Sequence, residues 1–270
     1  MNGADALEMA RSRFRPVDLA QLDAAAALTH RVDTKYLVPV TVLAGVLEQL
    51  LSTHACLAID GHRSFRYSSS YVDSPELTCY HDHRRGVRKR WKARARIYRD
   101  SGQARWEVKL KDGRGMTVKH ALPLPDRADG DLTPQMRSFL ADVLRRDYRR
   151  SAPVELTPTL TVDYRRTTLT HLGEENRMTV DSDLQMTSGS RSARLRTDLV
   201  LVETKTPSGR SAADQALRAA GARPCSVSKY CAGMALLDPT LPDHPWRQLL
   251  SRNFVPTAPG RPVSRQELAA

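Results

Sequence analysis

Two neighbouring segments between Trp91 and Lys111 show the same strict alternation of polar and apolar residues, separated by the short turn sequence D-S-G. Because the side chains of a β-strand point to opposite faces in turn, this pattern predicts an antiparallel β-hairpin. One face of the hairpin would carry six basic side chains with one Glu and one Tyr, and these eight residues are Lys92, Arg94, Arg96, Tyr98, Arg105, Glu107, Lys109 and Lys111.

The simplest explanation of this charged face is that it is the solvent side of an ordinary sheet. Such a face normally mixes its signs, because like charges opposite each other across a ladder destabilise the sheet. An anionic ligand that neutralises the face explains the bias better. The whole chain is also basic, with 42 Lys and Arg against 30 Asp and Glu and a formal charge of +12. This favours nucleic acid, an anionic membrane surface or a phosphorylated small molecule as partner.

Strands with one charged side recur along the chain. Besides the hairpin, strands are predicted over residues 31–38, 65–73, 116–122, 156–169, 176–184 and 198–206. About eight such strands suit a closed antiparallel β-barrel, because closure removes the exposed edges of a sheet. The apolar faces would pack outward against helices, and the charged faces would surround a water-filled basic lumen that binds a ligand.

Helices are predicted between these strands, over residues 16–27, 40–53 and 211–221 and after a probable N-cap at Thr133. The predicted fold class is therefore α+β, a closed barrel flanked by several helices. Three regions are expected, namely an N-terminal lead with a short helix (1–27), the barrel domain (28–237) and a proline-rich peripheral tail (238–270). Residues 1–15 are expected to be loosely ordered.

The remaining features indicate a cytoplasmic protein with free thiols. The four cysteines, Cys56, Cys79, Cys225 and Cys231, lack the spacing of a zinc site. No signal peptide is expected at the N-terminus, and no apolar run approaches the roughly 18 residues of a spanning helix. The segment 81–90 is expected to be a polar loop, with His81 and His83 solvated rather than bound to a metal.

Eight motifs occur in a fixed order, namely R-V-D-T-K-Y-L-V, K-A-R-A-R-I-Y-R-D-S-G, W-E-V-K-L-K-D, T-V-K, D-Y-R-R-T-T-L, R-M-T-V-D-S-D-L, V-L-V-E-T-K and V-S-K-Y-C-A-G. Together they resemble the vacuolar transporter chaperone (VTC) polyphosphate polymerase domain, which belongs to the triphosphate tunnel metalloenzyme (CYTH-like) superfamily. The resemblance covers residues 28–237. It implies that the barrel is a triphosphate tunnel.

The resemblance also implies roles for individual residues. Phosphate-binding roles are implied for Lys35, Arg94, Arg96, Lys109, Lys119, Arg166, Arg177, Lys205 and Lys229. Catalytic roles are implied for Arg94, Arg96, Lys109, Arg166, Arg177 and Glu203. Glu203, helped by Asp181, would hold Mn²⁺ or Mg²⁺ that bridges phosphate oxygens. Tyr98, Tyr164 and Tyr230 are expected to pack or to line the rim.

The implied reaction transfers the γ-phosphoryl group of ATP to a growing polyphosphate chain, with ADP as the leaving group. Arginine forks and lysine charges would stabilise the charge of the transition state. The first tunnel strand departs from the E-x-E-x-K pattern of many tunnel enzymes, because it carries Arg31, Asp33 and Lys35. The loss of one acidic position argues against a two-metal triphosphatase.

Two alternatives remain, a module that binds polyphosphate without turnover and a hydrolase of inorganic or nucleoside triphosphate. RNA is the weaker ligand, because stacking aromatic residues are sparse at 6% of the chain, and no specific nucleic-acid partner is expected. The phosphate-sensing and membrane-spanning domains of the fungal complex are not found in this sequence. A membrane-protein partner is therefore left open.

Overall fold

The structure is a computed structural model that describes residues 3–25, 32–111, 116–125 and 132–257. The strands in these ranges are β1 (Arg15–Val17), β2 (Val32–Pro39), β3 (His54–Leu57), β4 (Phe65–Asp73), β5 (Arg90–Tyr98), β6 (Ala104–Lys111), β7 (Thr117–Leu124), β8 (Thr157–His171), β9 (Arg177–Ser188), β10 (Arg191–Leu195), β11 (Leu199–Thr206) and β12 (Phe254–Thr257). The helices are α1 (Gly3–Ser12), α2 (Leu19–Ala25), α3 (Val40–Leu50), α4 (Thr78–Arg84), α5 (Pro134–Tyr148), α6 (Ala212–Ala219), α7 (Lys229–Leu237) and α8 (Arg247–Asn253).

The predicted hairpin is confirmed as β5 and β6. Its turn contains Gly102 with a φ of +73°, a conformation that L side chains rarely adopt. On the apolar parity, Ala93, Trp106 and Val108 are buried, and they share a core cluster with Leu140 of α5. The basic residues therefore lie on the opposite face of the hairpin, as the alternation predicts.

The other predicted strands are confirmed as β2, β4, β7, β8, β9 and β11. The helix after Thr133 is confirmed as α5, and the Thr133 hydroxyl accepts a hydrogen bond from the Met136 amide at 3.3 Å. Two expectations fall outside the described residues, the position of Arg31 on the first tunnel strand and the part of the proline-rich tail from 258 to 270.

All the strands belong to one sheet, whose main ladder runs β7-β6-β5-β4-β8-β9-β11-β2. The ladder branches at β9, because the first part of that strand pairs with β11 and the last part pairs with β10. Neighbours along this ladder are antiparallel, as predicted, whereas the short β1 pairs with β3 in parallel. One long strand thus organises both halves of the molecule.

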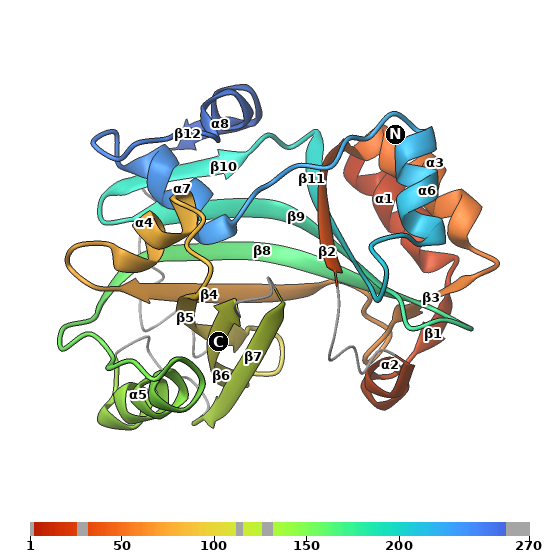
Figure 1. The fold of residues 1–270 in the computed structure, drawn as a ribbon. Helices are drawn as coiled ribbons and strands as arrows, with labels where there is room; N and C mark the ends of the chain where they lie inside the picture. The colour runs from red at the N-terminus through yellow and green to blue at the C-terminus, as the bar shows by residue number, and fades with distance from the viewer. Residues whose placement is uncertain (1–2, 26–31, 112–115, 126–131, 258–270) are drawn as a thin grey trace, which may run out of the picture.

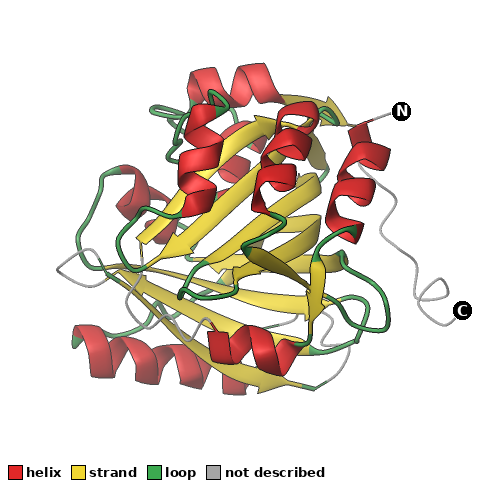
Figure 2. Cartoon of the chain, turned by 90° about the vertical axis from the view of Figure 1, so that its right-hand side faces the viewer, coloured by secondary structure: helices red, strands yellow, loops and turns green. Residues whose placement is uncertain are grey.

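The sheet is strongly curved, and helices cover its outer side above and below (Figure 2). In Figure 1, α5 lies beneath β6 and β7, whereas α1, α3 and α6 lie beside β2 and β11. The second group buries an apolar cluster that includes Leu43 and Leu47 of α3 with Tyr36, Val38 and Val202 of the strands. The apolar faces of the strands therefore pack outward against helices, as predicted.

Strand pairing in the described residues does not confirm the predicted closure of the barrel. Within the described ranges the ladder ends at β7 on one side and at β2 on the other. The two arms are linked across the inner face by an ion pair, in which Lys109 Nζ of β6 lies 3.4 Å from Asp33 Oδ2 of β2. The curved antiparallel sheet is confirmed, but in the described residues β7 and β2 do not pair with each other to close it.

Helix α7 lies on the inner side of the sheet, against β8, β9 and β10. It packs very closely at Gly233, where a Cβ atom would lie 2.6 Å from the Leu160 side chain. Ser228 caps the helix by accepting a hydrogen bond from the Cys231 amide. The helix therefore brings its first residue, Lys229, to the inner face.

The prediction of a loosely ordered N-terminal lead is wrong. Residues 3–12 form α1, which packs on α3, and Leu7, Ala10 and Phe14 are buried in the core. The spacing of these three residues gives the segment one apolar side, and tertiary packing stabilises a helix that is too short to persist alone. The predicted helix at 16–27 is shorter, because β1 occupies its beginning.

Two further expectations are also wrong. Residues 81–84, expected to begin a polar loop, belong to α4, and residues 247–257 form α8 and β12 instead of a peripheral tail. Strand β12 pairs with β10, and both Trp246 and Phe254 are buried. A few widely spaced apolar residues anchor this proline-rich segment. Within the described ranges, none of the helices combines the length and the hydropathy needed to cross a bilayer.

We expect Trp246→Ala to lower the free energy of unfolding by about 3 kcal/mol, as removal of a buried Trp typically does. The side chain is 3% exposed, and its Nε1 donates to the Ser226 carbonyl at 3.0 Å. Urea unfolding measures the change. Val154→Ala is the control, because Val154 is 94% exposed and its loss should cost less than about 0.5 kcal/mol. Equal effects of the two substitutions would contradict the placement of this segment.

Candidate functional site

Nine basic side chains from six strands and α7 converge on the inner face of the curved sheet. They are Lys35 (β2), Lys92, Arg94 and Arg96 (β5), Lys109 (β6), Lys119 (β7), Arg166 (β8), Lys205 (β11) and Lys229 (α7). Four carboxylates share this face, those of Asp33, Glu107, Asp181 and Glu203. Lys109 stands directly between Lys92 and Lys119 in the ladder. These neighbouring lysines repel one another, and an anion that binds among them relieves the repulsion.

Glu107 is the buried centre of the first group of charges. Its carboxylate is 2% exposed and accepts a hydrogen bond from Arg94 Nε at 2.8 Å, and Lys119 Nζ lies 3.3 Å away. Arg96 Nε lies 3.7 Å from the same carboxylate, and Arg94 also donates to the Tyr71 hydroxyl. Burial raises the pKa of Glu107, but the three cations outweigh it and hold the pKa well below its usual range. This carboxylate therefore orients three predicted phosphate ligands at once.

Asp181 is the centre of the second group. Arg166 binds both of its oxygens, with Nε and Nη2 at 2.6 and 2.8 Å, and Lys229 Nζ pairs with the same carboxylate. Burial raises the pKa of Asp181, but Arg166 and Lys229 outweigh this effect and lower it to about 2. Both oxygens are thus engaged by cations, so this carboxylate positions Arg166 and Lys229.

Glu203 lies in the third group, where β2 and β11 pair. Its Oε1 is bonded to Lys205 Nζ, and Lys35 stands opposite it in the ladder. Burial raises the pKa of Glu203, but Lys205, Lys35 and Lys109 outweigh it and hold the pKa well below its usual range. The carboxylate is therefore ionised at neutral pH.

Lys109 connects this third group to the hairpin. Its side chain is 45% exposed, so its ammonium group reaches water. Desolvation, together with Lys35 and Lys205, lowers the pKa of Lys109 to about 8 against the opposing effects of Asp33 and Glu203. Lys109 is thus a cation whose charge changes just above neutral pH.

Tyrosine rings lie beneath several of these cations. Tyr67 and Tyr164 are stacked with their centroids 5.3 Å apart. The Arg96 guanidinium lies 5.6 Å from the Tyr67 centroid, and Arg166 and Lys229 lie 5.2 and 4.7 Å from that of Tyr164. Contacts of this kind hold cations over aromatic faces and leave their hydrogen-bond donors available to a ligand.

Tyr164 packs in the interior, which was one of its two expected roles, and does not lie at a rim. It is 3% exposed, and its hydroxyl has no hydrogen-bond partner in the part of the chain that the structure describes. Burial raises its pKa, but Arg96, Arg166 and Lys229 outweigh burial and lower the pKa below its usual value. An unpartnered phenol among three cations is well placed to donate to a phosphate oxygen. Tyr230 also packs as expected, but its hydroxyl is bonded to Asp73.

His83 and Lys92 extend the site toward α7. Lys92 Nζ donates to the Ser228 hydroxyl at 2.6 Å and lies 3.1 Å from His83 Nδ1. Desolvation, Lys92 and Arg90 lower the pKa of His83 to about 2, so its ring is neutral and accepts from Lys92. His83 is thus a half-buried residue that stacks on Trp246, which corrects the expectation of a solvated loop residue.

The structure brings together all the predicted site residues except one. Arg177 lies at the edge of the face, where its guanidinium donates to the Leu22 carbonyl of α2 at 3.0 Å. Glu107, Lys92 and Tyr164 were not assigned to the site from the sequence. The alternation of the hairpin had already placed Glu107 and Lys92 on the charged face, so the signal was present for these two.

The family model of the VTC domain matches residues 30–238 of this chain. The chain belongs to the VTC domain family. No sequence match to a curated protein was found. Solved structures with some likeness to this VTC domain share little sequence with it. One is a candidate adenylate cyclase from Bacillus halodurans, with 14% identity and a TM-score of 0.46 over 73% of this chain and 93% of that chain. Another, a candidate adenylyl cyclase from Hippeastrum with a dominant triphosphatase activity, has 13% identity and a TM-score of 0.45 over 76% of this chain and 95% of that chain.

Few carboxylates on the inner face of this VTC domain are available to a metal ion. The described residues contain no cluster of three or more His, Cys, Asp or Glu that could hold a metal ion. Asp181 has both oxygens bonded to cations, whereas Glu203 is bonded through Oε1. One hard carboxylate oxygen suits Mn²⁺ or Mg²⁺ when phosphate oxygens and water complete the coordination. The donor set therefore fits a metal that arrives with a phosphorylated substrate.

We expect Glu107→Gln to destabilise the ligand-free VTC domain by about 3 kcal/mol, because it leaves the cations around Glu107 uncompensated. The same substitution should tighten the binding of tripolyphosphate, since it removes one negative charge from the inner face. Urea unfolding and calorimetric titration measure the two effects. Glu175→Gln, in an exposed turn, is the matched control and should change neither. Weaker tripolyphosphate binding by Glu107→Gln would contradict this account of the charge balance.

We expect the affinity for tripolyphosphate to fall as the pH rises through about 8, because Lys109 then loses the proton that carries its charge. Below this pH the cation is fully present. Lys109→Arg keeps its charge throughout this range and should remove this part of the pH dependence. Titrations of both proteins with the same ligand separate the effect from ionisation of tripolyphosphate itself. Identical pH profiles would contradict a change in the charge of Lys109 within this pH range.

Proposed function

We propose that this VTC domain is a metal-dependent polyphosphate polymerase. The observation that supports it best is the excess of nine basic side chains over four carboxylates on one inner face. Such an excess fits a ligand with several negative charges in a row, as in ATP and in polyphosphate. We further propose that the two arms of the sheet enclose this ligand as a tunnel.

The reaction would join two phosphates directly. An oxygen of the terminal phosphate of the polyphosphate chain attacks the γ-phosphorus of ATP, and the bond to the β-phosphate oxygen breaks to release ADP. In this proposal Arg94, Arg96 and Arg166 hold equatorial oxygens of the transferred group, where negative charge accumulates. Glu107 and Asp181 hold these arginines in place before the substrate binds. The arrangement supplies orientation and electrostatic stabilisation rather than a protein nucleophile.

Glu203 is the proposed metal ligand, at the junction of β2 and β11. A bound Mn²⁺ or Mg²⁺ would neutralise charge between neighbouring phosphates. Lys35, Lys205 and Lys109 surround the same carboxylate and would bind the phosphate oxygens that the ion leaves uncovered. Lys229 and Tyr164 contact the neighbouring part of the face and complete the proposed phosphate path.

The charge distribution favours phosphate over water as the acceptor. The carboxylate that remains on the first tunnel strand, Asp33, is paired with Lys109, so it neutralises a cation here. The neighbouring cations Lys92, Lys109 and Lys119 can attract the anionic acceptor as readily as the anionic donor. A hydrolase of triphosphates and a binding module without turnover remain the alternatives. They differ from the polymerase in their products, so one assay separates the three.

We expect the purified protein to convert ATP and Mn²⁺ into long polyphosphate and ADP, with the products separated on a gel and free phosphate measured in parallel. Glu203→Gln should lower turnover by about 100-fold or more and largely preserve polyphosphate binding. Arg94→Ala with Arg96→Ala should weaken binding and reduce its salt dependence. Glu175→Gln serves as the control that keeps full activity.

Each other outcome identifies a different function. Release of free phosphate without chains would show a triphosphatase. Tight binding of polyphosphate without turnover of ATP would show a binding module. Full activity of Glu203→Gln would overturn the proposed metal ligand, and preferential binding of RNA over polyphosphate would overturn the proposed substrate.

A further inference from the structure

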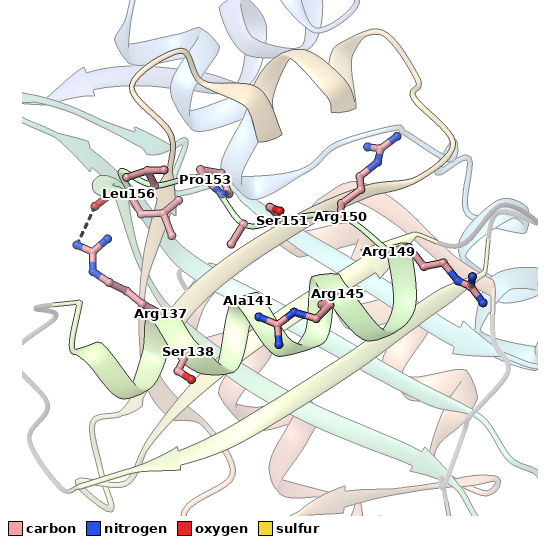
Figure 3. A pocket seen from close by; sticks show the side chains of 11 residues that line it. Arg137, Ser138, Ala141, Arg145, Arg149, Arg150, Ser151, Pro153 and Leu156 are labelled. Carbon is pink, nitrogen blue, oxygen red and sulfur yellow. Dashed lines mark hydrogen bonds between the residues drawn. The ribbon is translucent and has the colours of Figure 1, made fainter.

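A second basic surface lies outside the curved sheet, on the solvent side of α5. The helix and the segment 149–156 border a groove of about 650 Å³, which we call the α5 groove. Four arginines line it, Arg137, Arg145, Arg149 and Arg150, and Figure 3 shows their side chains along the helix and the following segment. None of the residues that line the groove is acidic or aromatic.

The arginines follow the geometry of the helix. Arg137, Ala141 and Arg145 are four residues apart and lie on neighbouring turns of α5, and Arg149 is the C-cap residue that directly follows the helix. The eight residue steps from Arg137 to Arg145 correspond to roughly 12 Å along the helix axis. Ala141 stands between the first two arginines, so a small side chain leaves the middle of this row open. A linear ligand could thus contact three guanidinium groups in succession.

The helix dipole explains only part of this charge. It favours cations near the C-terminus, where Arg145 and Arg149 lie, but it disfavours a cation in the first turn, where Arg137 lies. Internal pairing is also weak. Arg145 is bonded to Asp142 at 3.1 Å, but the two side chains are 74% and 64% exposed, and such pairs contribute little to stability. The groove therefore keeps most of its positive charge for a ligand.

The α5 groove adjoins the strands that form the inner face. The Tyr148 hydroxyl at the end of α5 donates to the carbonyl groups of Arg90 and Lys111. These carbonyls lie at the end of the hairpin where Lys111 follows Lys109 on the basic parity. Arg149 and Arg150 come directly after this anchor. A polyanion that leaves the inner face at this end of the hairpin would meet the groove next.

We propose that the α5 groove is a second polyphosphate-binding site, which holds the part of a long chain that extends beyond the inner face. This proposal rests on the proposed function. Guanidinium forks bind phosphate oxygens well, and the groove offers no aromatic ring on which a nucleic-acid base could stack. A linear chain of phosphates is thus the ligand whose chemistry fits the lining.

The test compares long-chain polyphosphate with tripolyphosphate, which is short enough to bind at the inner face alone. The groove variant carries Arg145→Gln and Arg150→Gln. Arg149 is left unchanged, because it is the C-cap residue of α5 and the variant should keep the end of this helix as it is. The control variant carries Arg194→Gln and Arg252→Gln, which remove two exposed charges from β10 and α8, on the side of the molecule opposite α5 (Figure 1).

We expect the groove variant to bind long chains roughly tenfold more weakly than the wild type and with a smaller salt dependence. Its affinity for tripolyphosphate should stay within about twofold, and the control variant should resemble the wild type for both ligands. Equal loss of affinity in the groove and control variants would show a nonspecific charge effect and overturn the proposal. An unchanged affinity for long chains would overturn it as well.

A second background separates this proposal from the proposed function. With Arg94→Ala and Arg96→Ala, the inner face is weakened, and the residual binding of long polyphosphate should still depend on Arg145 and Arg150. If the wild-type protein does not turn over ATP but long-chain binding shows this pattern, the polymerase is refuted and the proposed α5 groove site remains supported. If single-stranded RNA of equal charge displaces the long chain from the groove more readily than polyphosphate does, the proposed ligand is wrong.

Discussion

Repulsion among basic side chains is the constraint on which the inner face of this VTC domain depends. Nine cations converge there, and the fold keeps them together with four carboxylates, two of which are almost completely buried. Glu107 gathers two arginines and a lysine, and Asp181 holds Arg166 and Lys229. Buried charges of one sign are costly unless they are paired and hydrogen-bonded. These carboxylates therefore make a strongly basic surface compatible with a folded protein in the absence of a bound anion.

The distribution of apolar residues follows from the same constraint. The inner face is polar, so the hydrophobic core has to form on the outer side of the sheet. Trp106 and Val108 are buried in the core cluster that includes α5, and Tyr36 and Val202 are buried in the cluster that includes α3. The helices are thus needed to cover the strands, and α7 is the exception because it packs on the inner side. That exception delivers Lys229 to the site.

The sequence allowed the principal strands to be predicted, because strict alternation is a local signal that survives without knowledge of neighbours. Helix α7 was missed, since seven of its nine residues are buried and the segment shows no one-sided pattern. The segment with α8 and β12 was missed for a different reason, because Trp246 and Phe254 gain their stability from distant partners. Most of the candidate site residues were predicted from the resemblance to a family. That resemblance did not reveal that Glu107 and Asp181 are occupied by cations, which depends on the strand order and on side-chain packing.

The ion pair between Lys109 and Asp33 has a consequence for how a substrate reaches the inner face. The pair connects the two arms of the sheet at this point, and Lys109 is nearly half exposed. Water screens the pair on the lysine side, so an incoming phosphate can compete with Asp33 for Lys109. A phosphate that binds Lys109 would then also release the contact between the two arms of the sheet. A polymer could be laid into the domain sideways, along its length, without having to be threaded from a free end.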